Sequence, residues 1–142
     1  MKNYIISMLI LILFLRCSGV NSSYVDNSIA ATEKFKNEVL KKLEAEKENY
    51  SIIDFTDYFL NNTIILSNSK GVFFNKEIST VESLGYAFSA RIDNDFETVV
   101  YDKSNNYKFI IPINKYKFIY ISREKNKKKY KILYSNVLHG YR

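Results

Sequence analysis

The last third of the chain alternates β-prone runs with turn sequences at intervals of about ten residues. The runs are residues 85–92, 96–102, 107–112, 116–122 and 130–138, and they are rich in Tyr, Phe, Ile and Val, which favour strands. Clusters of Asn, Asp, Ser and Lys separate the runs and favour turns. Because short connections join antiparallel neighbours, the pattern predicts an antiparallel meander.

A helical pattern precedes these runs. Ala31, Phe35, Val39 and Leu43 recur between residues 28 and 48 at a spacing that places them on one helix face. Such a helix needs a sheet against its apolar face to be stable. We therefore expect an α+β fold, with an N-terminal amphipathic helix packed on a curved antiparallel β-meander. This outline is similar to cystatin-like and nuclear-transport-factor-like domains, folds that host enzymes and binding proteins alike.

Two further segments lie between the helix and the last third. Residues 51–60 fit a short helix or an irregular strand equally well. Residues 63–67 and 72–75 are short β-rich runs on either side of a turn sequence that ends in Gly71. This arrangement predicts a β-hairpin, because glycine permits the backbone conformations that tight turns require.

The N-terminus has the build of an export signal. Lys2 is followed by an apolar stretch whose core, 5–15, is eleven residues long. A signal-peptide core has about 7–15 apolar residues, whereas a helix that spans a membrane needs about 20. A buried helix of the folded domain is the alternative. The position after a basic residue and before a small, polar stretch favours the export signal.

Residues 14–18, Phe-Leu-Arg-Cys-Ser, resemble the lipobox of bacterial lipoproteins. In that family the signal is cleaved before the cysteine, which carries the lipid, including palmitate. Arg16 replaces the small residue that the family prefers, so the resemblance is to the relaxed lipobox of spirochaetes. It implies a lipid on Cys17 and a position in the cell envelope, at the outer membrane or the cell surface. The alternative is cleavage after Gly19 and a secreted or periplasmic protein.

These features divide the chain into three parts. Residues 1–16 are expected to be the signal peptide, 17–28 the lipidated cysteine with a polar tether, and 29–142 a single domain. Cys17 is the only cysteine, so no internal disulfide is available. A domain of this length can form a core without one.

Charge is divided unevenly along the chain. Residues 17–102 contain eight basic and fourteen acidic residues, whereas residues 103–142 contain eleven basic residues and a single acidic one, Glu124. One explanation is structural: if the basic strands lie beside acidic ones in the sheet, their charges largely cancel. The alternative is a basic face for an acidic protein, an acidic glycan or an anionic lipid headgroup. Its candidate residues are Lys115, Lys117, Arg123, Lys125, Lys127, Lys128, Lys129 and Lys131. Export argues against a nucleic-acid partner.

The sequence contains few residue patterns that indicate catalysis. His139 is the only histidine, and neither a nucleophile elbow nor a glycine-rich phosphate loop is present. Asp93, Asp95 and Glu97 cluster at a predicted turn and are a weak candidate for a calcium site. We expect no cofactor.

The pattern as a whole favours a non-enzymatic binding module that is anchored to a membrane. The alternative is a small-molecule pocket under the sheet, with a ligand-binding or hydrolytic role. Such a pocket would gather polar groups such as Asp54, Asp57 or Arg91.

Overall fold

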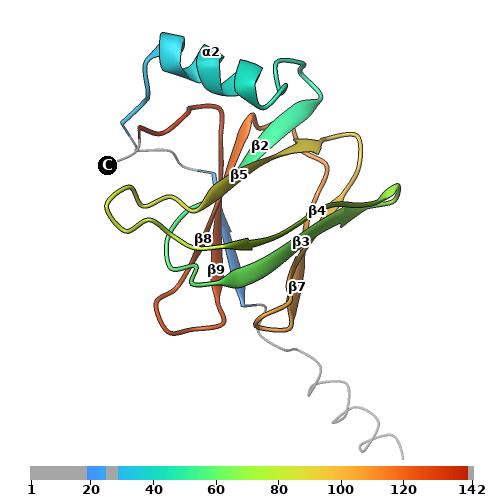
Figure 1. The fold of residues 1–142 in the computed structure, drawn as a ribbon. Helices are drawn as coiled ribbons and strands as arrows, with labels where there is room; N and C mark the ends of the chain where they lie inside the picture. The colour runs from blue at the N-terminus through green and yellow to red at the C-terminus, as the bar shows by residue number, and fades with distance from the viewer. Residues whose placement is uncertain (1–18, 25–28, 141–142) are drawn as a thin grey trace, which may run out of the picture.

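The computed structural model describes residues 19–24 and 29–140. The predicted signal segment and Cys17 therefore lie outside the described residues. Strands make up 48% of the structure and helix 8%. Nine strands in the described part of the chain form two sheets, and the single helix α2 lies at one end (Figure 1).

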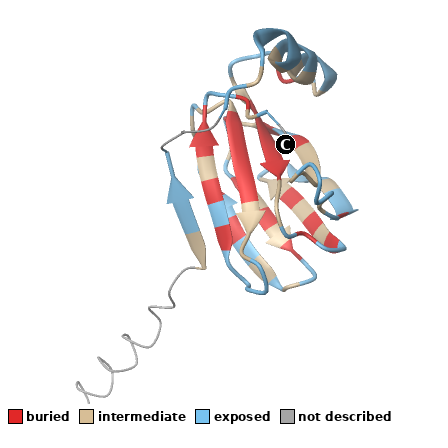
Figure 2. Cartoon of the chain, turned by 90° about the vertical axis from the view of Figure 1, so that its left-hand side faces the viewer, coloured by how far each residue is buried: buried red, intermediate tan, exposed pale blue. Residues whose placement is uncertain are grey.

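The larger sheet has five strands in the order β1-β9-β8-β2-β5. The strands are β1 (Val20–Ser23), β9 (Tyr130–Ser135), β8 (Phe118–Arg123), β2 (Tyr50–Phe55) and β5 (Phe88–Asp93). The sheet is mixed, because β2 pairs with β8 and β1 with β9 in parallel, while the other pairs are antiparallel. Figure 2 shows the central strands largely buried and β1 exposed at the edge.

The smaller sheet has four strands in the order β4-β3-β6-β7. These are β4 (Gly71–Ile78), β3 (Asn62–Asn68), β6 (Thr98–Asp102) and β7 (Tyr107–Ile111), and all neighbouring pairs are antiparallel. The β3–β4 hairpin confirms the turn predicted at Gly71, which has a φ of +123°. A residue with a side chain would be strained in that conformation.

The main core fills the space between the two sheets. Alternate residues of each strand point into it, as the period of a strand requires. The core residues include Ile53, Phe55, Ile64, Leu66, Val100, Phe109, Ile111, Ile119, Ile121 and Ile132. The inner face of each sheet is therefore covered by the other sheet.

Helix α2 (Glu33–Lys42) covers part of the outer face of the larger sheet. The helix begins after Thr32, whose Oγ1 accepts a hydrogen bond of 3.3 Å from the backbone N–H of Phe35. Its apolar residues Val39 and Leu40 pack against a second cluster that contains Ile52 and Phe118. Strands β2 and β8 are thus covered on both faces, and this double burial explains their continuous apolar sequences.

The predicted α+β fold, with a helix on a curved meander, is wrong. The protein is β-rich, and a second sheet rather than the helix covers the inner face of the larger sheet. The predicted strands are present, but β5 pairs with β2 and β8 pairs with both β2 and β9. Sequence spacing indicates where strands lie, whereas long-range packing decides which strands pair.

Part of the segment expected to be a polar tether, 17–28, forms a strand. Residues 20–23 form β1, which pairs with β9 at the edge of the larger sheet. The backbone N–H of Tyr130 donates a hydrogen bond of 2.7 Å to the carbonyl oxygen of Gly19. The chain is therefore attached to the sheet from Gly19 onward.

Candidate functional site

The predicted basic residues are centred on the loop that joins β8 to β9, residues 124–129, which we call the basic loop. Two backbone hydrogen bonds close it: the N–H of Glu124 donates to the carbonyl of Lys129 at 3.0 Å, and that of Lys127 to the carbonyl of Glu124 at 3.1 Å. Asn126 takes up a positive φ of 59° at the turn, a conformation that asparagine tolerates. The loop has a defined shape and presents its lysines to solvent.

The single carboxylate of this loop is paired within it. Lys127 Nζ lies 3.0 Å from Glu124 Oε2. The hydrogen bond from Lys127 lowers the pKa of Glu124, and the charges of Lys127, Lys131 and Lys129 lower it further. Glu124 therefore offsets one of the four lysines of the basic loop, and Lys125, Lys128 and Lys129 remain exposed.

Arg123, which precedes the loop, is an anchor rather than an exposed cation. Its backbone N–H donates to the carbonyl of Asp57 at 3.0 Å. Its Nη1 donates to the carbonyl of Tyr58 and to Asn62 Oδ1, both at 3.2 Å. Its Nη2 donates to the carbonyl of Lys127 at 3.4 Å. Arg123 thus holds the basic loop against residues 56–61.

Lys115 and Lys117 lie at the opposite end of β8 from the basic loop. A strand of six residues spans about 20 Å, so these two lysines do not extend the cluster of the loop. Lys117 Nζ donates to the carbonyls of Lys47 at 2.7 Å and Tyr50 at 3.0 Å. Burial lowers the pKa of Lys117, although the charge of Glu48 opposes the shift. The basic face predicted from the sequence therefore consists of two separate groups.

The described chain begins beside the basic loop. A Cβ placed on Gly19 would lie 3.1 Å from the carbonyl oxygen of Lys128 and 2.9 Å from the hydroxyl of Tyr107. In Figure 1, the blue strand β1 begins at the same lower end as the β8–β9 loop, whereas α2 lies at the upper end. Cys17 is two residues before Gly19 in the sequence. The candidate lipid-attachment residue is therefore close in sequence to a residue that touches the basic loop.

Residues 56–61 present two apolar side chains at this end. Tyr58 is 53% exposed and Leu60 is 79% exposed. Tyr58 and Asn61 have positive φ angles of 65° and 50°. Asparagine tolerates this conformation, whereas it is unfavourable for Tyr58, and such strained residues often occur at functional sites. Sequence patterns did not identify these two exposed residues, because contacts through Arg123 bring them to the basic loop.

A buried polar network supports this end of the molecule. Asp102 is fully buried, and its Oδ2 accepts hydrogen bonds from Tyr130 Oη at 2.6 Å, Asn105 Nδ2 at 2.7 Å and Asn62 Nδ2 at 2.8 Å. Burial raises the pKa of Tyr130, and the hydrogen bond to Asp102 adds to the increase. Because Asp102 belongs to the smaller sheet and Tyr130 to the larger one, the network joins both sheets.

The remaining candidate polar groups do not converge on one site. Asp54 is buried in β2 and accepts a short hydrogen bond from Ser89 Oγ. Arg91 lies 4.6 Å from the ring centroid of Tyr50, and Asp57 lines a different cavity. The ring of His139 stacks on Tyr120, with centroids 3.8 Å apart.

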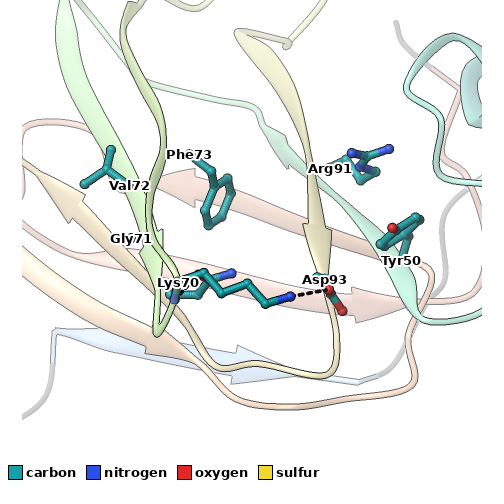
Figure 3. Close-up of a pocket in the computed structure, with 8 residues that line it drawn as sticks. Tyr50, Lys70, Gly71, Val72, Phe73, Arg91 and Asp93 are labelled. Atoms are coloured by element: carbon teal, nitrogen blue, oxygen red, sulfur yellow. Dashed lines mark hydrogen bonds and ion pairs between the residues drawn. The ribbon is translucent and has the colours of Figure 1, made fainter.

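A cavity of about 240 Å³ lies between the β3–β4 turn and β5 (Figure 3). Lys70 Nζ and Asp93 Oδ2 are 3.9 Å apart at its edge. Lys70 also lies 4.1 Å from the ring centroid of Phe96, and Arg91 pairs with Glu44 at 3.3 Å. The charged groups of this cavity already have partners within the protein, so it offers little charge to a ligand.

A second cavity, of about 500 Å³, is lined mainly by aromatic and amide residues near Tyr24, Tyr116 and Tyr134. The rings of Tyr24 and Tyr134 stack with centroids 5.2 Å apart. Burial raises the pKa of Tyr134 to about 12, and the charge of Tyr24 contributes to the shift.

The turn at residues 93–97 does not have the form of a metal site. Asp93 Oδ1 accepts the backbone N–H of Asp95 at 3.1 Å, and Asp95 Oδ2 accepts Asn49 Nδ2 at 3.3 Å. Across residues 19–24 and 29–140, no three Asp, Glu, His or Cys side chains gather in a way that could hold a metal ion. The weak calcium hypothesis for Asp93, Asp95 and Glu97 is therefore not supported by the geometry.

A third cavity, of about 480 Å³, lies beside the basic loop. Its lining residues come from the 56–61 segment, the turn that follows β4, the end of β8 and the start of the basic loop. They are Asp57, Tyr58, Phe59, Leu60, Thr80, Glu82, Arg123, Lys125 and Asn126. This cavity combines charges of both signs with exposed apolar residues.

Comparison with protein-family models, curated proteins and solved structures finds no significant match. Among the described residues, no helix has both the length and the apolar character needed to cross a membrane.

Proposed function

We propose that this protein is an exported lipoprotein that carries its lipid on Cys17 and acts as a non-enzymatic binding module at an anionic membrane surface. The observation that carries the proposal is the contact between the start of the described chain and the basic loop. Gly19 lies against Lys128, so a lipid on Cys17 would hold the loop close to the membrane. The basic loop and the exposed Leu60 then face the lipid.

The energetics of membrane binding support this arrangement. Each Lys or Arg near an anionic membrane contributes about 1 kcal/mol. A diacylated Cys17 would supply the anchor, and a basic patch adds attraction to anionic headgroups. Lys125, Lys128 and Lys129 provide such a patch, and the exposed Tyr58 and Leu60 suit the headgroup region.

The alternative of a pocket under the sheet has less support. Side chains of the smaller sheet fill the inner face of the larger one, and Asp54, Asp57 and Arg91 do not meet. An acidic protein or glycan partner would use the same exposed lysines. The proximity of Gly19 to the loop favours the membrane over these partners, because attachment at Cys17 already places the loop there.

Metabolic labelling with palmitate tests the lipid anchor. We expect the full chain, produced in a bacterium that makes lipoproteins, to take up the label, and Cys17→Ser to take up none. Ser18→Ala is the matched control and should be labelled like the wild type. An unlabelled wild-type chain, or equal labelling of Cys17→Ser, would contradict the proposal.

A further inference from the structure

The cavity beside the basic loop is lined by charges of both signs, which the membrane proposal does not use. Arg123 and Lys125 line it from the end of β8 and the start of the loop, and Asp57 and Glu82 also line it. Its volume of about 480 Å³ lies within the range of small-molecule sites, about 300–1,000 Å³. A ligand with a single charge would meet a like charge as well as an opposite one.

The acidic residues of the cavity are held near each other. Asp57 Oδ1 lies 3.3 Å from where a Cβ on Gly85 would be, so the Asp57 carboxylate faces the turn that contains Glu82. Thr80 fixes this turn to the 56–61 segment, because its Oγ1 accepts the N–H of Phe59 at 3.0 Å and donates to the carbonyl of Thr56 at 2.5 Å. These hydrogen bonds connect the two segments that carry the carboxylates.

Arg123 places a positive charge at the wall of the cavity. Arg123 Nε is buried and makes no hydrogen bond, although both Nη atoms are bonded to backbone or side-chain oxygens. Buried donors without acceptors are rare in folded proteins and call for a physical explanation. A phosphate bound at Lys125 would be attracted by the guanidinium charge, although the Nη atoms of Arg123 already donate to oxygens of the protein.

We propose that this cavity binds the phosphate–ammonium zwitterion of a phospholipid headgroup. The exposed Lys125 would bind the phosphate and the nearby charge of Arg123 would attract it, while Asp57 and Glu82 would hold the ammonium group. Tyr58 and Leu60, exposed at the rim, would contact the first part of the acyl chains. The identification of a lipid as the source of the zwitterion rests on the proposed membrane function, whereas the charge selectivity of the cavity does not.

Phosphorus NMR titration of the full chain in a maltoside detergent tests this assignment. The ligands are glycerophosphoethanolamine, free phosphoethanolamine, glycerol phosphate and a short-chain phosphatidylethanolamine, with ethanolamine as a competitor. We expect the zwitterion glycerophosphoethanolamine to bind at least tenfold more tightly than glycerol phosphate. The short-chain lipid should bind most tightly, and free phosphoethanolamine should bind no better than glycerophosphoethanolamine.

Two charge variants separate the halves of the site. Glu82→Gln should weaken binding of glycerophosphoethanolamine about tenfold without weakening that of glycerol phosphate, because it removes a partner of the ammonium group alone. Lys125→Gln should weaken both. Glu77→Gln, which neutralises an exposed carboxylate in β4 outside the cavity lining, is the matched control and should change neither.

The proposal is overturned if no ligand binds, or if glycerol phosphate binds as well as the zwitterion and Glu82→Gln has no effect. Tighter binding of free phosphoethanolamine than of the short-chain lipid would overturn the lipid assignment. These outcomes are independent of palmitate labelling at Cys17, so a failure here is distinguishable from a failure of the membrane anchor.

Discussion

Replacing Asp102 by alanine should lower the free energy of unfolding by about 3 kcal/mol. Asp102 is fully buried and accepts hydrogen bonds from Tyr130, Asn62 and Asn105. Its removal would leave several donors without an acceptor, and each buried unsatisfied donor costs about 1–3 kcal/mol. Urea unfolding of the full chain, followed by circular dichroism, measures the change.

Asp95→Ala is the matched control, because Asp95 is an exposed carboxylate with one long hydrogen bond to Asn49. We expect it to change stability by less than about 0.5 kcal/mol. Tyr130→Phe, which removes one partner of Asp102, should have an intermediate effect. If Asp102→Ala were as stable as Asp95→Ala, the hydrogen-bond network around Asp102 would not stabilise the packing of the two sheets.

Removing the charge of the exposed lysines of the basic loop should greatly weaken binding to anionic vesicles. The variant Lys125→Gln, Lys128→Gln, Lys129→Gln should lose about 3 kcal/mol of binding free energy at low salt, since each lysine contributes about 1 kcal/mol. That loss corresponds to roughly a hundredfold lower partition coefficient. The difference should shrink at high salt, because ions screen exposed charges.

Vesicle binding is compared between chains that all carry Cys17→Ser. Any contribution of the N-terminal segment to binding is then the same in every variant. The matched control replaces Lys34, Lys41 and Lys42, which are exposed on α2 at the opposite end of the molecule. This variant has the same net charge as the loop variant, and we expect less than about a threefold effect, because its lysines lie beyond a Debye length from the membrane. Equal losses for the two variants would show that net charge, rather than the loop, governs binding.

Local patterns in the sequence predicted the positions of most strands but not their partners. Tyr107–Ile111 and Phe118–Arg123 are strands, as their β-prone residues indicate. However, β8 lies parallel to β2, which is far away in the sequence. The apolar residues of both strands must be buried on two faces, and only the packed structure shows that α2 covers one face and the smaller sheet the other.

The sequence predicted only part of the candidate site, because contacts between distant segments form the rest. The run of lysines before Tyr130 indicates an exposed basic loop without any knowledge of the fold. The role of Arg123 as an anchor, and the exposure of Leu60 beside the loop, depend on contacts between segments about 65 residues apart. Asp102 ends a β-prone run beside a turn sequence, and nothing in that pattern indicates that the meeting of the two sheets buries it.

The central claim is that the end of the domain with the basic loop lies on the membrane, and quenching of a fluorescent label tests it most directly. If Cys17 carries a lipid, a cysteine introduced as Leu60→Cys provides the one free thiol for labelling. Lys41→Cys places the label on α2, at the other end of the molecule. We predict that lipid-borne nitroxide quenchers strongly quench the label at position 60 and leave the label at position 41 nearly unaffected. Equal quenching at the two positions, or stronger quenching at position 41, would contradict the account.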